Sequence, residues 1–280
     1  QLVLENGLIR RTFSLEPGVA TVAFDNLVTG SSLIRAVKPE ALVSLDGQSY
    51  AVGGLTNQPE PAFLRPEWVG EMKPIPGALV CTRFESGPIQ APFPWKRTRH
   101  AESLPWPAPG VALEFHYAPP DVADHVELVV HYELYDGLPV IGKWIRIENH
   151  SEKPVTIDSF SSEVLATAEV ESAVDERGFR NWRLPALDFL SDYSFHGMDA
   201  TTASQTTVWL PDPSYTSQVN YERKMPALVV SRPPIGPDVR IQPGEKFQSF
   251  RTFVVVHDSD DRERQGLALR GYFGYDYYQK

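Results

Sequence analysis

A run of alternating apolar and polar residues between positions 126 and 165 constrains the fold of this 280-residue chain more than any other feature. Within 126–135 every second residue is apolar, which is the period of a β-strand with one buried face. Asp136-Gly137 then predicts a tight turn into 139–148, and Asn149-His150-Ser151 predicts another into 154–165. We expect these segments to form adjacent long antiparallel strands at the centre of a β-sandwich.

Shorter segments with the same alternation predict strands along most of the chain. The 25 prolines and 19 glycines supply many turns, which is typical of short strands rather than long helices. Asp46-Gly47 predicts a hairpin, because both residues tolerate a positive φ. The region 53–110 is expected to be irregular and proline-rich, and 170–205 to be a polar loop with short elements. The further strands are expected at 8–15, 19–25, 40–45, 48–50, 111–117, 206–210, 216–222, 226–231, 238–242 and 247–257.

Length and composition agree with one large all-β domain over 1–257. All-β sandwiches of about 200–250 residues around a single core are common. With 42% hydrophobic and 11% aromatic residues, the chain can fill such an interior. No repeat with the period of a solenoid or propeller is visible. The expected fold class is therefore all-β, a large antiparallel β-sandwich with a short C-terminal helix.

Composition also excludes several classes of function. A net charge of −10 argues against a nucleic-acid partner, and no apolar run is long enough to span a membrane. Dinucleotide, phosphate-loop, zinc-protease and serine-hydrolase motifs are absent, so we predict no cofactor and no metal ligands. Cys81, the only cysteine, is expected to be a buried thiol. The sequence opens at Gln1 rather than Met, which favours an extracellular or periplasmic protein whose signal peptide has been removed.

Residues 258–280 are expected to form a separate C-terminal element. Asp258 or Ser259 can cap a helix that runs to about residue 270, with acidic residues in its first turn. Contiguous aromatic side chains mark association surfaces, and such a cluster follows this helix. We predict that the tail packs on a partner, with folding back onto its own sandwich as the alternative. The aromatic residues of the tail are Tyr272, Phe273, Tyr275, Tyr277 and Tyr278.

The irregular region 53–110 holds three tryptophans and a cluster of cations. Sugars stack their C–H faces on aromatic rings and exchange hydrogen bonds with cationic side chains. Four residues are therefore candidates for carbohydrate binding, and a groove here would make the chain a sugar-binding module. The alternative is that the indoles only fasten a long loop to the sandwich. The candidates are Trp68, Trp95, Arg97 and Trp106.

Histidines and carboxylates offer a weaker candidate site. On the expected strand 126–134, Glu127, His131 and Glu133 project to one side, with His116 on a preceding strand. A histidine beside a carboxylate can act as an acid–base pair. The simpler interpretation is that these are polar residues on an exposed face. No pair of carboxylates is marked by its spacing as the pair that glycoside hydrolysis requires, and no catalytic residue is predicted.

Beyond these patterns, the sequence resembles the N-terminal domain that precedes the catalytic barrel in melibiase-type α-galactosidases (glycoside hydrolase family 36-like). The strongest likeness is Tyr135-Asp136, then a strand, then Arg146 and Asn149. The resemblance covers nearly the whole chain, although its motifs are mostly turn glycines, helix caps and strand-end asparagines. The stretches that carry it are 26–30, 39–40, 52–54, 131–141, 144–150, 154–157, 243–245, 249–251 and 258–264.

The resemblance implies a fold and a role. It implies a β-supersandwich related to galactose mutarotase, with the catalytic aspartates on a following (β/α)₈ barrel. It further implies an accessory, non-catalytic domain that shapes the rim of a glycoside hydrolase active site or an oligomer interface, so 258–280 would lead toward the barrel. The expected partners are carbohydrate and either that barrel or a second copy of the chain. The alternatives are a stand-alone carbohydrate-binding module and a mutarotase-like sugar epimerase, whose relatives use a histidine–carboxylate pair.

Overall fold

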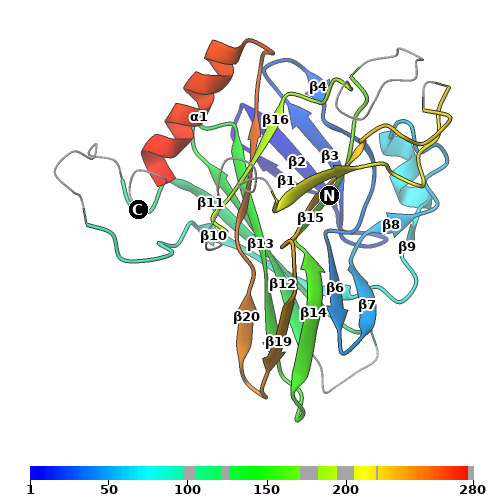
Figure 1. The fold of residues 1–280 in the computed structure, drawn as a ribbon, viewed down its shortest axis with the longest axis vertical. Coiled ribbons are helices and arrows are strands. Elements are labelled where there is room, and N and C mark those ends of the chain that lie inside the picture. Colours follow the sequence, from blue (N-terminus) through cyan, green and yellow to red (C-terminus); the bar gives the residue numbers. More distant parts are fainter. Residues whose placement is uncertain (97–104, 121–125, 171–181, 194–204, 219, 277–280) are drawn as a thin grey trace.

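The computed structural model describes residues 1–96, 105–120, 126–170, 182–193, 205–218 and 220–276, with side chains up to residue 269. Antiparallel sheets dominate these residues, with one 3₁₀-helix, η1 (Pro66–Glu71), and one α-helix, α1 (Arg262–Asp276). Figure 1 shows α1 and η1 on opposite sides of the sheets. The all-β sandwich with a C-terminal helix is therefore confirmed. No helix in the described part of the chain is both long and apolar enough to cross a membrane.

The largest sheet has seven strands in the order β10-β11-β12-β13-β21-β16, with β20 also beside β13. All of its strand pairs are antiparallel. One face of the sheet packs into the main hydrophobic core. Its strands are β10 (Val80–Pro88), β11 (Gly110–Ala118), β12 (Val126–Tyr135), β13 (Val140–Asn149), β16 (Leu187–Ser191), β20 (Lys246–Gln248) and β21 (Thr252–Val256).

Three four-stranded sheets and a two-stranded one complete the sandwich. The first contains β1 (Leu2–Glu5), β2 (Ile9–Ser14), β3 (Ala20–Asn26) and β4 (Ser31–Ser32). The second contains β6 (Ala41–Leu45), β7 (Gln48–Val52), β14 (Val155–Ser161) and β19 (Pro237–Ile241). The third contains β5 (Ile34–Ala36), β15 (Glu163–Thr167), β17 (Thr207–Leu210) and β18 (Leu228–Ser231). The smallest pairs β8 (Leu55–Thr56) with β9 (Lys73–Pro74).

The predicted central strands are confirmed only in part. The strands β12 and β13 pair over nearly their whole length, with their apolar stripes in the core. After Asn149, however, the chain leaves this sheet, and β14 and β15 belong to two different sheets. The expectation that 126–165 forms adjacent strands is thus wrong for its last third. A turn read from sequence ends one strand, but it does not specify the sheet in which the next strand pairs.

Some of the other local predictions are confirmed and others are wrong. Asp46 and Gly47 have φ of 48° and 79°, so the expected hairpin between β6 and β7 is confirmed. The region expected to be irregular contains the nine-residue edge strand β10, which is mostly exposed and polar. Cys81 lies on this strand and is half-buried rather than buried, and burial raises the pKa of its thiol to about 11. The expected strand 216–222 is wrong, because its described residues form turns and irregular structure.

The C-terminal helix is capped at Asp261, two or three residues later than expected. The Asp261 carboxylate accepts a hydrogen bond from the Arg264 backbone N–H at 3.0 Å, the geometry of an N-cap. Ser259 instead accepts from the Asp261 N–H, and Asp258 forms an ion pair with Arg264. The helix also extends beyond residue 270, to Asp276. On its inner side Leu269 packs against the cluster formed by Tyr135, Val140, Phe253 and Val255 with their neighbours.

Four charged residues are buried between the sheets and form what we call the interior charge cluster: Arg11, Glu40, Lys143 and Glu163. All are at most 1% exposed. Arg11 forms two hydrogen bonds with Glu163, at 2.7 and 3.2 Å, and the Lys143 ammonium lies 2.7 Å from the same carboxylate. Glu40 accepts from the Tyr132 hydroxyl. Two cations thus face two carboxylates without solvent, so the loss of one of these side chains would leave a buried charge without its partner.

Candidate functional site

The outer face of the large sheet carries the histidines and carboxylates that the sequence places on one side of 126–134. We call this surface the histidine face. Alternation along the strands turns Leu128, Val130 and Tyr132 into the core and the intervening residues outward. The predicted separation of the two faces is therefore confirmed. The side chains of the histidine face are Glu114, His116, Glu127, His131, Glu133, Trp144, Arg146 and Glu148.

His131 is held in a stack rather than exposed. Its ring lies parallel to Trp144 with centroids 4.8 Å apart, and the Arg251 guanidinium lies 4.5 Å from the Trp144 centroid. The His131 Nδ1 atom is 3.2 Å from a carboxylate oxygen of Glu114. Burial, reinforced by the charge of Arg146, lowers the pKa of His131 to about 3. This imidazole is therefore neutral at physiological pH.

His116 occupies the neighbouring strand β11 and is equally buried. Its Nδ1 lies 3.3 Å from Glu127 Oε2, and its Nε2 lies 3.6 Å from Glu114 Oε2. Neither ring nitrogen has a hydrogen bond of good geometry within the described part of the chain. At the same end of the sheet, potential metal-ligating atoms of Glu127, Glu148 and His150 all lie within 4.8 Å of one another. These residues are the best candidates for holding a cation.

Burial decides how the histidine face can function. His116 and His131 are only 3% and 5% exposed, so the expectation of an exposed polar face is wrong. An acid–base pair that acts on a sugar must reach a substrate hydroxyl within hydrogen-bond distance. The two imidazoles are instead closed in among carboxylates and the Trp144 ring. The geometry therefore supports an ionic network better than an epimerase site.

Two of the candidate sugar-binding residues lie together in the segment that follows β10. Trp95 and Trp106 have ring centroids 6.0 Å apart, and Phe93 lies 5.0 Å from Trp106. The Trp106 indole N–H donates to the Phe93 carbonyl at 3.0 Å. Trp95 Nε1 is buried and has no hydrogen-bond partner among the described residues. This grouping combines indole surface with a buried donor that has no partner among the described residues.

The other two candidates do not join this pair. Trp68 lies on η1. Its ring centroid lies 5.3 Å from that of Phe63, and the Arg65 guanidinium carbon lies 5.8 Å from the Trp68 ring centroid. In Figure 1, η1 lies on the right, whereas the described residues around 90–96 lie on the left near the C-terminal end of α1. Arg97 falls outside the described residues. The structure therefore groups Trp95 with Trp106 and places Trp68 elsewhere.

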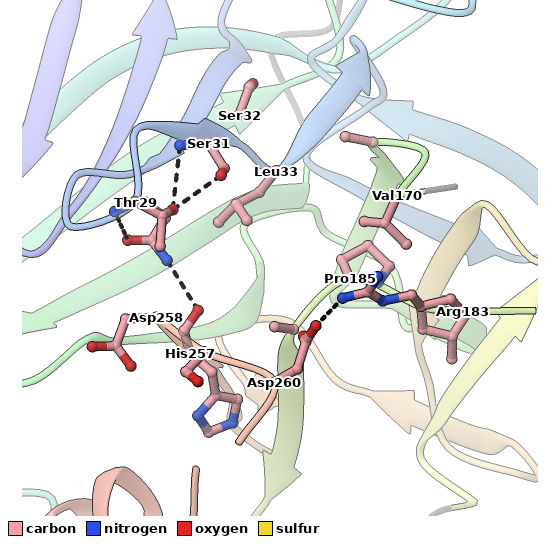
Figure 2. A pocket seen from close by; sticks show the side chains of 15 residues that line it. Thr29, Ser31, Ser32, Leu33, Val170, Arg183, Pro185, His257, Asp258 and Asp260 are labelled. Atoms are coloured by element: carbon pink, nitrogen blue, oxygen red, sulfur yellow. Dashed lines mark hydrogen bonds and ion pairs between the residues drawn. The ribbon is translucent and has the colours of Figure 1, made fainter. Parts of the chain in front are cut away.

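A pocket of about 240 Å³ opens where the β3–β4 turn meets the segment that leads into α1 (Figure 2). The Thr29 and Ser31 hydroxyls lie on one side, and an ion pair between Arg183 and Asp260 crosses the other. The Asn26 side-chain amide donates a hydrogen bond to the His257 carbonyl at 3.0 Å, which holds the two segments that line the pocket together. Its described lining combines hydroxyl groups and charges with aliphatic side chains such as Leu33, Val170 and Leu184, and contains no Trp, Tyr or Phe ring on which a sugar could stack. It is a small pocket of mixed polar and apolar character.

The predicted aromatic interface falls largely outside what can be described. Tyr272, Phe273 and Tyr275 lie within α1, but side chains are described only to residue 269, and 277–280 lie outside the described residues. Just before them, a groove of about 360 Å³ separates α1 from the sandwich. Leu267 on its rim is 62% exposed. This side of the molecule therefore presents apolar surface beside the described part of the helix.

Comparison with known proteins gives a likeness of fold. No family model matches this chain, and no curated protein does. Among solved structures, the α-galactosidase of Lactobacillus brevis is 11% identical with a TM-score of 0.52, over 98% of this chain and 41% of that one. The family GH36 α-galactosidase AgaB of Geobacillus stearothermophilus is 14% identical with a TM-score of 0.45, over 90% and 39%. A galactose mutarotase related enzyme of Lactobacillus acidophilus is 10% identical with a TM-score of 0.40, over 93% and 98%.

The chain therefore spans about two fifths of the length of the α-galactosidases that it matches. The Lactobacillus brevis structure, which has the highest TM-score of these three, matches almost the whole chain. The expected resemblance in fold to part of an α-galactosidase is thus confirmed.

Proposed function

We propose that this chain is an accessory, non-catalytic domain of an α-galactosidase-like glycoside hydrolase acting in carbohydrate degradation. The likeness of 98% of the chain to part of the Lactobacillus brevis α-galactosidase carries the proposal. That part is 41% of the enzyme, which leaves room there for a catalytic barrel of roughly 250 residues. In this proposal the catalytic carboxylates lie on a barrel outside this chain, and the sandwich shapes the active-site rim or an oligomer interface.

The arrangement of carboxylates within the described residues supports a non-catalytic role. A glycosidase needs two carboxyl groups that face each other across the bond to be cleaved. Glu40 and Glu163 are buried in the interior charge cluster, out of reach of a sugar. Glu127 and Glu148 are engaged with arginine, lysine and histidine side chains. None of these four carboxylates is placed as a facing catalytic pair, which supports the proposal that the catalytic groups lie outside this chain.

The groove beside α1 is the best candidate for the surface that meets the barrel. Leu8 and Val28 line its sandwich side, and Leu267 and Ala268 line its helix side. The inner Leu269 anchors the helix to the sandwich, which leaves the exposed Leu267 for a partner. The helix follows β21 directly, so a domain connected after it would begin on this side of the molecule.

The first test is enzymatic. The pure 280-residue chain should not hydrolyse aryl α-galactosides, whereas a (β/α)₈ barrel encoded downstream or in an adjacent gene should do so when combined with it. Sustained turnover by the chain alone, abolished by changing one of its carboxylates, would contradict the proposal. Binding of raffinose by the isolated chain that is lost in Trp106→Ala would instead favour the sugar-binding module, to which the Trp95–Trp106 pair points.

A second arm of this test locates the interface. Leu267→Asp and deletion of 272–280 should each weaken association with the barrel, or between copies of the chain, as measured by analytical ultracentrifugation. Ile235→Asp is the matched control, because Ile235 is 80% exposed in the turn before β19. If the deletion leaves association unchanged and lowers only the melting temperature, the tail packs on its own sandwich.

A further inference from the structure

Two carboxylates directly oppose each other where β12 begins and β13 ends. Glu127 pairs with Glu148 in the register of these antiparallel strands, and both side chains lie on the histidine face. Like charges at directly opposed positions destabilise a sheet unless a cation lies between them. Glu148 is 10% exposed and Glu127 is 18% exposed, so water screens their repulsion only in part. This end of the sheet therefore favours a bound positive charge.

Two histidines approach the same pair of carboxylates from different elements. His150, in the turn after β13, places Nε2 at 4.0 Å from Glu127 Oε2 and 3.8 Å from Glu148 Oε2. His116, on β11, places Nδ1 at 3.3 Å from the same Glu127 oxygen. The His116 side chain is 4% exposed, and both of its ring nitrogens lack a well-formed hydrogen bond in the described structure. Buried polar atoms in this state are uncommon and require an explanation.

We propose that His116, Glu127, Glu148 and His150 form a binding site for a divalent transition-metal ion, with Zn²⁺ as the best fit. Two imidazoles and two carboxylates are suitable ligands for zinc, at roughly 2.0–2.2 Å from the metal. A tetrahedron with such bonds separates its ligand atoms by about 3.3 Å. The His116–Glu127, Glu148–His150 and Glu127–His150 separations of 3.3, 3.8 and 4.0 Å are close to this value. Ligand atoms of Glu127, Glu148 and His150 already lie within 4.8 Å of one another, whereas His116 lies outside that group and has to move toward it to complete the tetrahedron. Four protein ligands leave no open position, so the metal has a structural role.

The charged side chains around the site hold the proposed ligands in position and do not occupy the place of the metal ion. Arg146 Nε lies 2.6 Å from Glu148 Oε1, and Arg83 lies 3.5 Å from Glu127 Oε1, so each arginine holds the oxygen that faces away from the site. Glu114 Oε2 lies 3.6 Å from His116 Nε2, on the side opposite the metal-binding nitrogen. Zinc-ligating histidines commonly direct their second nitrogen to a carboxylate in this way.

Lys246 is the one competitor for the metal-facing oxygens among the described residues. Its ammonium lies 3.0 Å from Glu148 Oε2, the atom assigned to the metal, and its side chain is 59% exposed. A flexible and exposed lysine can move into solvent when a divalent ion enters. Removal of Lys246 should therefore strengthen metal binding, which is an effect opposite to that expected of a simple ion-pair network.

The test is equilibrium dialysis of the chelator-treated chain against Zn²⁺ alone, with isothermal titration calorimetry for the affinity. We expect one bound equivalent, weakened about tenfold or more in His150→Ala and in Glu127→Gln. Glu85→Gln is the matched control: Glu85 is also near His116, at 3.9 Å, but is 64% exposed and not a ligand, so binding should be unchanged. Lys246→Met should bind Zn²⁺ several-fold more tightly than the wild type.

Two results would overturn the site. One is the absence of a stoichiometric equivalent of Zn²⁺ in the folded wild-type chain. The other is equal affinity in the wild type, His150→Ala and Glu127→Gln, which would place the bound ion on other side chains. His150 lies in a turn with a half-exposed side chain, so its variant should fold normally by circular dichroism. If it does not, the pair Glu127→Gln and Lys246→Met, whose effects should be opposite in sign, decides the question.

Discussion

Charged side chains are buried on both faces of β12 and β13, but they are paired differently on each face. On the inner face, Lys143 belongs to the interior charge cluster, in which two cations meet two carboxylates without solvent, and Tyr132 donates a hydrogen bond to Glu40 of that cluster. On the outer face, His131 and Glu148 belong to a network that reaches the surface at His150. Residues adjacent in sequence thus serve opposite environments.

The two faces differ in whether their charged and polar groups all have partners. This difference indicates which face only supports the fold and which face can also bind a ligand. In the interior charge cluster each charged group has a partner at hydrogen-bond distance. On the histidine face the His116 nitrogens lack such partners in the described structure, and the carboxylates of two strands oppose each other. A complete network stabilises the fold, whereas an incomplete one at a surface edge can accept an ion.

The largest effect is expected from breaking the interior charge cluster. Glu163→Gln should lower the free energy of unfolding by about 3–5 kcal/mol, because it leaves Arg11 and Lys143 buried beside a neutral amide. Urea denaturation at neutral pH measures this. Glu5→Gln removes a carboxylate from the exposed pair with Arg10 and should cost less than about 1 kcal/mol. Equal losses in the two variants would contradict the comparison.

An intermediate effect should appear in the pH dependence of stability. The folded-state pKa of His131 is about 3, against 6.5 for an ordinary histidine, so between these values the unfolded chain binds a proton that the folded chain does not. Stability should therefore fall as pH falls from 6.5 toward 3. His131→Phe keeps an aromatic ring against Trp144 and should fall less steeply when unfolding is measured at a series of pH values with chelator present. Parallel curves for the two proteins would count against this role of His131.

Glu163 should contribute to the same titration at a lower pH. Burial opposes ionisation of this carboxyl, but Arg11 and Lys143 outweigh it and lower its pKa from 4.5 to about 2. Its contribution to stability is complete above pH 4.5 and is lost as pH falls toward 2. In His131→Phe the loss of stability below pH 4.5 should persist, because it belongs to Glu163. The same pH series therefore distinguishes the contribution of the inner face from that of the outer face.

The smallest effect is expected at the solvent edge of the histidine face. Lys246→Met removes an exposed cation from Glu148, which keeps its bond to Arg146. Metal-free protein should lose less than about 1 kcal/mol of unfolding free energy, since exposed ion pairs contribute little. Thermal unfolding with chelator present checks this. A loss as large as that of Glu163→Gln would mean that the outer network, like the inner one, exists to support the fold.

Much of the secondary structure was predictable from local pattern. The alternation of 126–135, the Asp46-Gly47 turn and the apolar stripe of 139–148 correspond to β12, the β6–β7 hairpin and β13. Local pattern was insufficient for β10, whose exposed and polar residues lack alternation because an edge strand buries little. The candidate site was predicted less well, since Trp68 proved distant in the fold from Trp95 and Trp106.

Sequence alone determined which residues of each strand share a face, because side chains alternate across a strand whatever lies beside it. Lys143 shares the buried stripe of Ile141 and Ile145, a sign of a buried charge that the sequence analysis did not use. Only the tertiary structure decided which strands pair beyond the hairpins that tight turns predict, and which charges meet. Glu163 reaches Arg11 across 152 positions of sequence, and Glu127 faces Glu148 only through the β12–β13 register. Such contacts depend on how strands associate in space, and the period of a single strand does not contain that information.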